Sequence, residues 1–101
     1  MNQAQLMAQV KKMQAEMTKA QEELASTIVT GAAAGGAVTV EASCDQRVKS
    51  VKISKDVVDP EDVETLEDLI VVAINDALAK STETSQQRMA SVTGGMRIPG
   101  L

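Results

Sequence analysis

The stretch VTGAAAGGAVTVEAS, residues 29–43, decides how the middle of this chain folds. It holds a patch of glycine and alanine at 31–37 between two valine-containing runs. A P-loop has two glycines separated by four residues, then Lys and Ser or Thr, at the start of a helix. Here three residues separate Gly31 from Gly35, no lysine follows, and the next run is β-branched. The patch therefore predicts a hairpin connection and not a phosphate site.

Three short runs rich in β-branched residues lie in the middle of the chain, at 27–30, 37–43 and 47–54. They predict a three-stranded antiparallel meander, with Asp45 and Gln46 in the second turn. In the third run Val48 is out of phase with Val51. This break in the alternation indicates either a β-bulge near Lys49 or a strand that is covered on both faces.

The first part of the chain, residues 2–25, contains neither glycine nor proline and predicts one long helix. Its apolar residues recur at alternating steps of four and three, which is a heptad pattern: Leu6, Val10, Met13, Met17, Ala20 and Leu24. The stripe is narrow, so we expect it to contact another helix while much of the surface projects into water.

A second long helix is predicted from Asp59, as the N-cap, and Pro60, as the first helical residue. No further glycine or proline occurs before Gly94. The segment LIVVAI, residues 69–74, is apolar almost all round, so it needs more cover than a three-stranded sheet provides. A chain of 101 residues without aromatic side chains has few other means of filling a core, and we therefore expect a homodimer.

These elements predict an α+β fold in one domain, residues 1–101. Its expected parts are a helical arm, a three-stranded sheet, a long helix and a tail, at 1–25, 26–58, 59–92 and 93–101. A helix of this length overhangs a short sheet. We expect its C-terminal half to pack antiparallel against the first helix, with the start of the chain near Arg88.

Composition argues against catalysis. The chain has no histidine, and its single cysteine, Cys44, ends a strand pattern where a partly buried packing role is expected. No serine or cysteine has an evident base partner, so we predict no catalytic residues, cofactor, metal or small-molecule substrate. The cluster of Asp59, Glu61, Asp62 and Glu64 has the residue types of a cation site, but a capped helix start explains it fully. The apolar runs are too short for a membrane span, and no signal peptide is recognisable, so a cytoplasmic location is expected.

Charge is segregated along the chain. Residues 59–68 carry six acids and no base, although the whole chain has a net charge of −4. Residues 1–19 hold three lysines against one glutamate, and residues 77–101 hold three bases against one glutamate. If the two helices meet, they form a basic arm that is able to contact phosphates through Lys11, Lys12, Lys19, Lys80, Arg88 and Arg97. The alternative is an ordinary solvated helix surface.

Four segments together resemble the YbaB/EbfC family of bacterial nucleoid-associated proteins: TGAAAGGAVTV, VKSVKIS, VVDPEDVETLEDLIVVAINDALAK and TGGMRIPG. The resemblance covers essentially the whole chain. It implies a tweezer-like homodimer with projecting helical arms, a location in the nucleoid, and binding of double-stranded DNA with relaxed sequence preference. The chain departs from the family pattern at Ala34, where a third glycine is usual, and at Thr39, where a basic residue is frequent.

The implied mechanism is neutralisation of phosphates by lysines and arginines, without base contacts. The absence of aromatic residues argues against single-strand binding by base stacking. A second hypothesis is a non-enzymatic adaptor, a dimer whose methionine-bearing helix seam or tail binds another protein.

Overall fold

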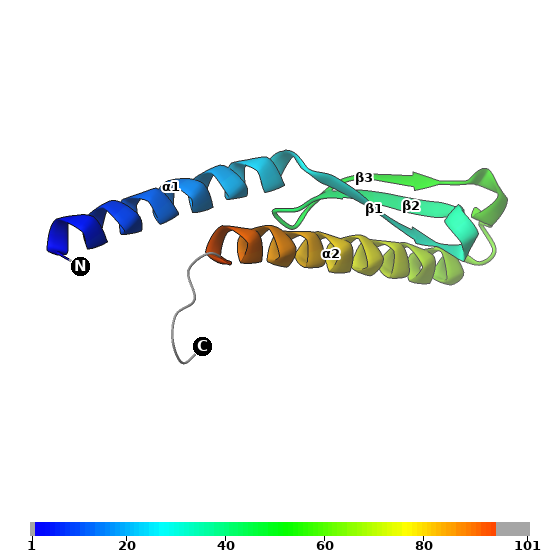
Figure 1. The fold of residues 1–101 in the computed structure, drawn as a ribbon. Coiled ribbons are helices and arrows are strands. Elements are labelled where there is room, and N and C mark those ends of the chain that lie inside the picture. The colour runs from blue at the N-terminus through cyan, green and yellow to red at the C-terminus, as the bar shows by residue number, and fades with distance from the viewer. Residues whose placement is uncertain (1, 95–101) are drawn as a thin grey trace.

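A computed structural model of the chain describes residues 2–94 and shows an elongated α+β fold, 70 × 26 × 17 Å (Figure 1). Two long helices flank a three-stranded sheet, and two short 3₁₀ turns join the elements. In chain order these are α1 (Gln3–Ser26), β1 (Ile28–Ala33), η1 (Ala34–Gly36), β2 (Val38–Ser43), β3 (Arg47–Ile53), η2 (Lys55–Val57) and α2 (Val63–Thr93). The elongated shape fits a tweezer-like arrangement.

The sheet is an antiparallel meander in the order β1-β2-β3. The first strand is longer than the sequence pattern suggested, because Gly31 pairs with Val40 and Ala33 pairs with Val38. The glycine and alanine patch is therefore a hairpin connection only in its second half. Gly35 and Gly36 take φ values of 67° and 96°, which glycine adopts readily because it has no Cβ.

Of the two explanations for the break in the third run, the β-bulge near Lys49 is confirmed. Glu41 pairs with Ser50 while Ala42 pairs with Val48, so Lys49 is the extra residue. Because of this insertion Val48 lies on the same face of the sheet as Val51, although the two are three residues apart in sequence.

The predicted start of the second helix was wrong. The helix begins at Val63, and its N-cap is Asp62, whose Oδ1 accepts a hydrogen bond from the Thr65 backbone N–H at 3.2 Å. Asp59 accepts from the backbone N–H of Glu61 at 2.9 Å and so closes a separate turn before the helix. Both aspartates are good capping residues, and the chain uses the second one for the helix.

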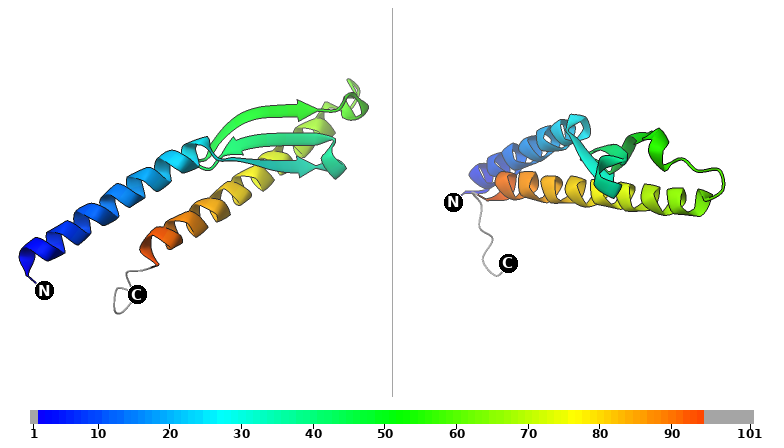
Figure 2. Two further views of the ribbon diagram at one scale, coloured as in Figure 1. Left: turned by 45° about the horizontal axis from the view of Figure 1, so that its top comes forward. Right: turned by 90° about the vertical axis from the view of Figure 1, so that its right-hand side faces the viewer.

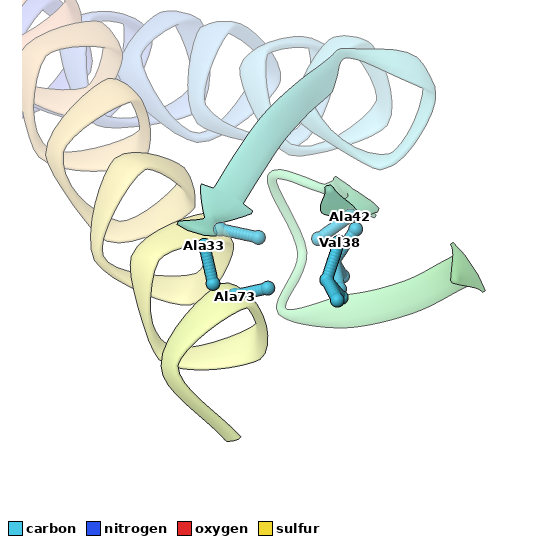
Figure 3. Packing of buried hydrophobic residues seen from close by; sticks show 6 residues of the cluster. Ala33, Val38, Ala42 and Ala73 are labelled. Atoms are coloured by element: carbon cyan, nitrogen blue, oxygen red, sulfur yellow. The ribbon is translucent and has the colours of Figure 1, made fainter. Parts of the chain in front are cut away.

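Helix α2 packs across one face of the sheet, over β1 and β2 (Figure 1). Val38, Ala42 and Ala73 are fully buried in this layer (Figure 3). The helix approaches so closely that a Cβ built on Gly31 would lie 2.8 Å from Cα of Ala77, and closer still to backbone atoms of the same helix. The absence of a side chain at Gly31 therefore allows the helix to reach the strand.

The C-terminal half of α2 packs antiparallel against the end of α1, as expected from the heptad pattern (Figure 2). Ala20 and Leu24 are buried there, whereas Leu6 and Val10 are 53% and 39% exposed. The start of the chain does not lie near Arg88, because that side chain contacts Glu23 near the end of α1. The N-terminal half of α1 extends beyond the end of α2 as a single projecting helix (Figure 1).

We predict that Gly31→Ala lowers the free energy of unfolding by about 3 kcal/mol, because α2 must move away from β1 to accommodate the methyl group. Urea unfolding of the two proteins measures the difference. The control is Thr30→Ala, at an exposed position of the same strand, which should change stability by no more than about 0.5 kcal/mol. Equal stability of Gly31→Ala and the parent would show that the close approach is not a constraint.

Candidate nucleic-acid interface

The three candidate lysines of α1 are exposed. Lys11 and Lys12 lie in its projecting half, away from the contact with α2. Lys19 lies further along and lines an open hollow between the two helices, together with Glu16, Arg88, Ser91 and Val92. Among residues 2–94 the ion pairs involve other bases, so these three ammonium groups are available to an external anion.

Lys80 has a different position from the one we expected of an arm residue. Its Nζ donates to the backbone oxygen of Thr30 at 3.0 Å and to Oδ2 of Asp76 at 3.2 Å. The same Asp76 oxygen accepts from the backbone N–H of Ala32 at 3.0 Å. Because β1 is an edge strand, these two side chains satisfy backbone groups that would otherwise be open to another strand.

Arg88 joins the two helices of the arm. Its guanidinium lies 3.0 Å from the Glu23 carboxylate through Nη2 and donates to it through Nε at 3.1 Å. The side chain is 35% exposed, so it is able to face a ligand while it holds this pair. The last candidate, Arg97, lies outside the described residues.

Four further bases were not among the candidates. Arg47, Lys49 and Lys52 belong to β3, and Lys55 belongs to η2. All four are exposed. The signal was present in the sequence, since residues 46–55 contain four bases and no acid. The charge pattern of the two helices alone does not identify these four bases.

An apolar patch lies beside α2, where the helix leaves β3 uncovered. Val48, Val51 and Ile53 face the helix side of the sheet but are 42%, 41% and 38% exposed. On α2, Val71 is 56% exposed. Val71 precedes Asp76 by five residues, so at about 100° per residue the two side chains point to roughly opposite sides of α2. Asp76 contacts β1, and Val71 therefore lies on the side of the helix away from the β1 edge. We call these four valine and isoleucine residues the apolar patch.

Other kinds of site are not evident in the described part of the chain. Residues 2–94 hold no group of three side chains able to ligate a metal ion. None of their helices is long and apolar enough to cross a membrane. The sole cysteine, Cys44, is 3% exposed, and its backbone N–H donates to the oxygen atoms of Leu24 and Thr27.

The fold and its surface define a class of small α+β proteins in which a sheet carries a projecting helical arm with exposed bases. Comparison with known proteins makes the assignment specific, because residues 1–96 match the YbaB/EbfC DNA-binding family. The chain belongs to this family.

Curated relatives cover nearly the whole chain. A nucleoid-associated protein of Chloroflexus aurantiacus is 53% identical over 96% of this chain and 97% of its own length. One of a Roseiflexus species is 50% identical over 99% of both chains. A crystal structure of an uncharacterized protein from Helicobacter pylori aligns with a TM-score of 0.74 at 24% identity, covering 86% of this chain and 91% of that one, which supports the fold.

We predict a pH-dependent effect of Asp76→Asn. The hydrogen bond from Ala32 and then the contact with Lys80 hold the pKa of the Asp76 carboxyl below its usual value. A lowered folded-state pKa stabilises the protein above the unfolded pKa of about 3.9, and this stabilisation is lost as the pH falls through the folded pKa. The variant should therefore be less stable than the parent at neutral pH, and the gap should close in acid.

Urea unfolding at several pH values between about 7 and about 2.5 measures this gap. The control is Asp68→Asn, at an exposed residue of the same helix that makes no ion pair with the described residues. A gap between Asp76→Asn and the parent that stays constant down to the lowest pH would contradict the ionic role of Asp76.

Proposed function

We propose that this protein binds double-stranded DNA as a homodimer, with little sequence preference, and acts in the organisation of the nucleoid without catalysing a reaction. The observation that carries the proposal is the placement of Lys11 and Lys12. Both are exposed on a helix that projects beyond the rest of the described chain, in a member of a DNA-binding family. The relatives named nucleoid-associated proteins support the same function.

The mechanism is electrostatic. Each ammonium group that contacts a phosphate displaces condensed counterions, and this release favours binding without any contact to base edges. The six proposed contacts remain Lys11, Lys12, Lys19, Lys80, Arg88 and Arg97. Within this set the α1 lysines require no rearrangement, whereas Lys80 and Arg88 already contact carboxylates of the same chain.

The homodimer is proposed to form through the apolar patch. The patch consists of Val71 on α2 and three partly exposed residues of β3. They lie on the same side of the chain, where the helix leaves the strand uncovered. A second copy is a fitting occupant, because a small chain without aromatic residues gains needed apolar burial by pairing. The β1 edge is a poor alternative, since Asp76 and Lys80 already bind two of its backbone groups, the Ala32 N–H and the Thr30 oxygen.

We predict that Val71→Lys raises the dimer dissociation constant by about a hundredfold, since each dimer then buries two lysines in an apolar interface. Val72→Lys is a matched control. Val71 and Val72 are 56% and 54% exposed and adjacent, but they point to different sides of α2. Sedimentation at micromolar concentration distinguishes the two variants. Loss of the dimer in Val72→Lys alone would place the interface elsewhere.

We predict that replacing Lys11 and Lys12 together by glutamine weakens duplex binding and flattens its salt dependence. The slope of log K against log salt should fall by about 0.9 per lost phosphate contact, hence by up to about 3.6 for a symmetric dimer. Thermal stability should be unchanged, because both side chains are exposed on the projecting part of α1.

The matched control replaces both lysines by arginine, which retains the charge and should retain the slope. Gel shifts across a salt series measure all three proteins. An unchanged affinity and slope in the glutamine variant would reject the arm mechanism.

The adaptor function remains the second candidate, and one observation favours it. Leu6 and Met7 are 53% and 51% exposed on the projecting part of α1, where an apolar partner could bind. Duplex retention that disappears with rising salt supports DNA binding, whereas no retention even at low salt would favour the adaptor.

A further inference from the structure

The densest basic segment of the chain is not on the arm. Residues 46–55 contain four bases and no acid, whereas helix α1 carries three lysines and three glutamates. Three of the four bases belong to β3, and Lys55 follows in η2. The face of the sheet on which these bases lie determines which ligands they are able to contact.

The strand register places two of these bases, Arg47 and Lys52, on the face of the sheet that points away from α2, whereas Lys49 is the unpaired bulge residue and Lys55 follows the strand in η2. Val38, Val40 and Ala42 are fully buried against the helix side, so the alternate residues of β2 point the other way. Lys52 pairs with one such residue, Thr39, and Arg47 pairs with another, Ser43. We call the side of the sheet away from α2 the outer face.

These side chains are not held by strong intramolecular contacts. The Arg47 side chain is 75% exposed and meets Asp45 only at 3.7 Å. Lys49, Lys52 and Lys55 are exposed and make no ion pair with the described residues. Lys80 and Arg88 differ from them, because each forms an ion pair with a carboxylate of the same chain.

The outer face remains accessible in the proposed dimer, because the apolar patch lies on the other side of the sheet. It is also continuous with the arm. Helix α1 and strand β3 both lie on the same side of α2, one following the other along the long axis of the molecule (Figures 1 and 2). A straight polyanion lying along this side would pass over both α1 and β3.

We propose that the outer face of β3 and the turn that follows it form a second phosphate-contact surface for duplex DNA, with Arg47 and Lys52 on the outer face, Lys49 in the bulge and Lys55 in η2. This inference rests on the proposed function and extends it from the arms to the sheet. The bases are spread along an extended strand, about 10 Å from Lys49 to Lys52, with small polar neighbours such as Ser50. Such a row of separate charges suits a continuous phosphate backbone better than a compact acidic ligand.

The molecule is long enough for a duplex to use both surfaces at once. Its length of 70 Å corresponds to about 20 base pairs at about 3.4 Å each. Glu41 opposes the interaction, because it lies on the outer face of the central strand, paired with Ser50. Glu41 therefore offers a variant that is expected to strengthen binding.

The first test replaces Lys49, Lys52 and Lys55 by glutamine and measures duplex affinity across a salt series. The slope of log K against log salt should fall by about 0.9 for each lost contact relative to the parent. This fall should add to the one produced by the Lys11 and Lys12 variant when the two sets of substitutions are combined. A variant with arginine at all three positions should keep the slope of the parent. Sedimentation and thermal melting confirm that the glutamine variant remains folded and dimeric.

The second test is Glu41→Gln, which should tighten duplex binding severalfold at low salt and less at high salt. Unfolding cannot produce such a gain. If the parent binds DNA and loses affinity only through the arm variant, while the triple variant and Glu41→Gln match the parent, the inference about β3 is wrong and the proposed function stands. If the parent does not bind DNA at any salt concentration, the proposed function itself fails.

Discussion

The close contact between the backbone of Gly31 and one turn of α2 is the constraint on which the rest of the structure depends. It brings the helix down onto β1, so that Ala73 and Ala77 fill the space with small side chains. A helix placed this near to the sheet edge covers two strands and leaves the third partly open. The uncovered valines of β3 are thus a direct consequence of the same contact.

The length of α2 links the sheet to the arm. Where the helix passes the β2–β3 turn, Ser81 is fully buried, donates to the Ser43 backbone oxygen at 3.0 Å and accepts from Gln46 at 2.7 Å. These bonds satisfy polar groups at the point where the helix leaves the sheet. Beyond it, Arg88 meets Glu23, so the direction of the arm is fixed by the helix that also forms the core.

The sequence predicted the meander and the antiparallel helices, because each follows from a local period of two, three or four residues, and it offered the bulge near Lys49 as one of two explanations for the break in the third run. It did not locate the start of α2, since Asp59 and Asp62 are equally suitable caps and only the surrounding turn selects between them. The sequence also did not predict the contacts that Lys80 and Arg88 make with distant parts of the chain. The Thr30 oxygen that Lys80 contacts and the Glu23 carboxylate that Arg88 contacts lie 50 and 65 residues away in the chain, and no local pattern reports these two contacts; only the Asp76–Lys80 pair has the local i,i+4 spacing.

An acidic chain is able to bind a polyanion when its charges are far enough apart. From Glu64 to Ser91 the helix rises about 40 Å, several times the screening length of about 8 Å in physiological salt. The acids at the start of α2 therefore act only on their own end of the molecule. Lys55 is next to Asp56 and close in sequence to this acidic end, whereas Lys49 and Lys52 lie within the strand. If the outer face contacts DNA, Lys49 and Lys52 should contribute more to binding than Lys55.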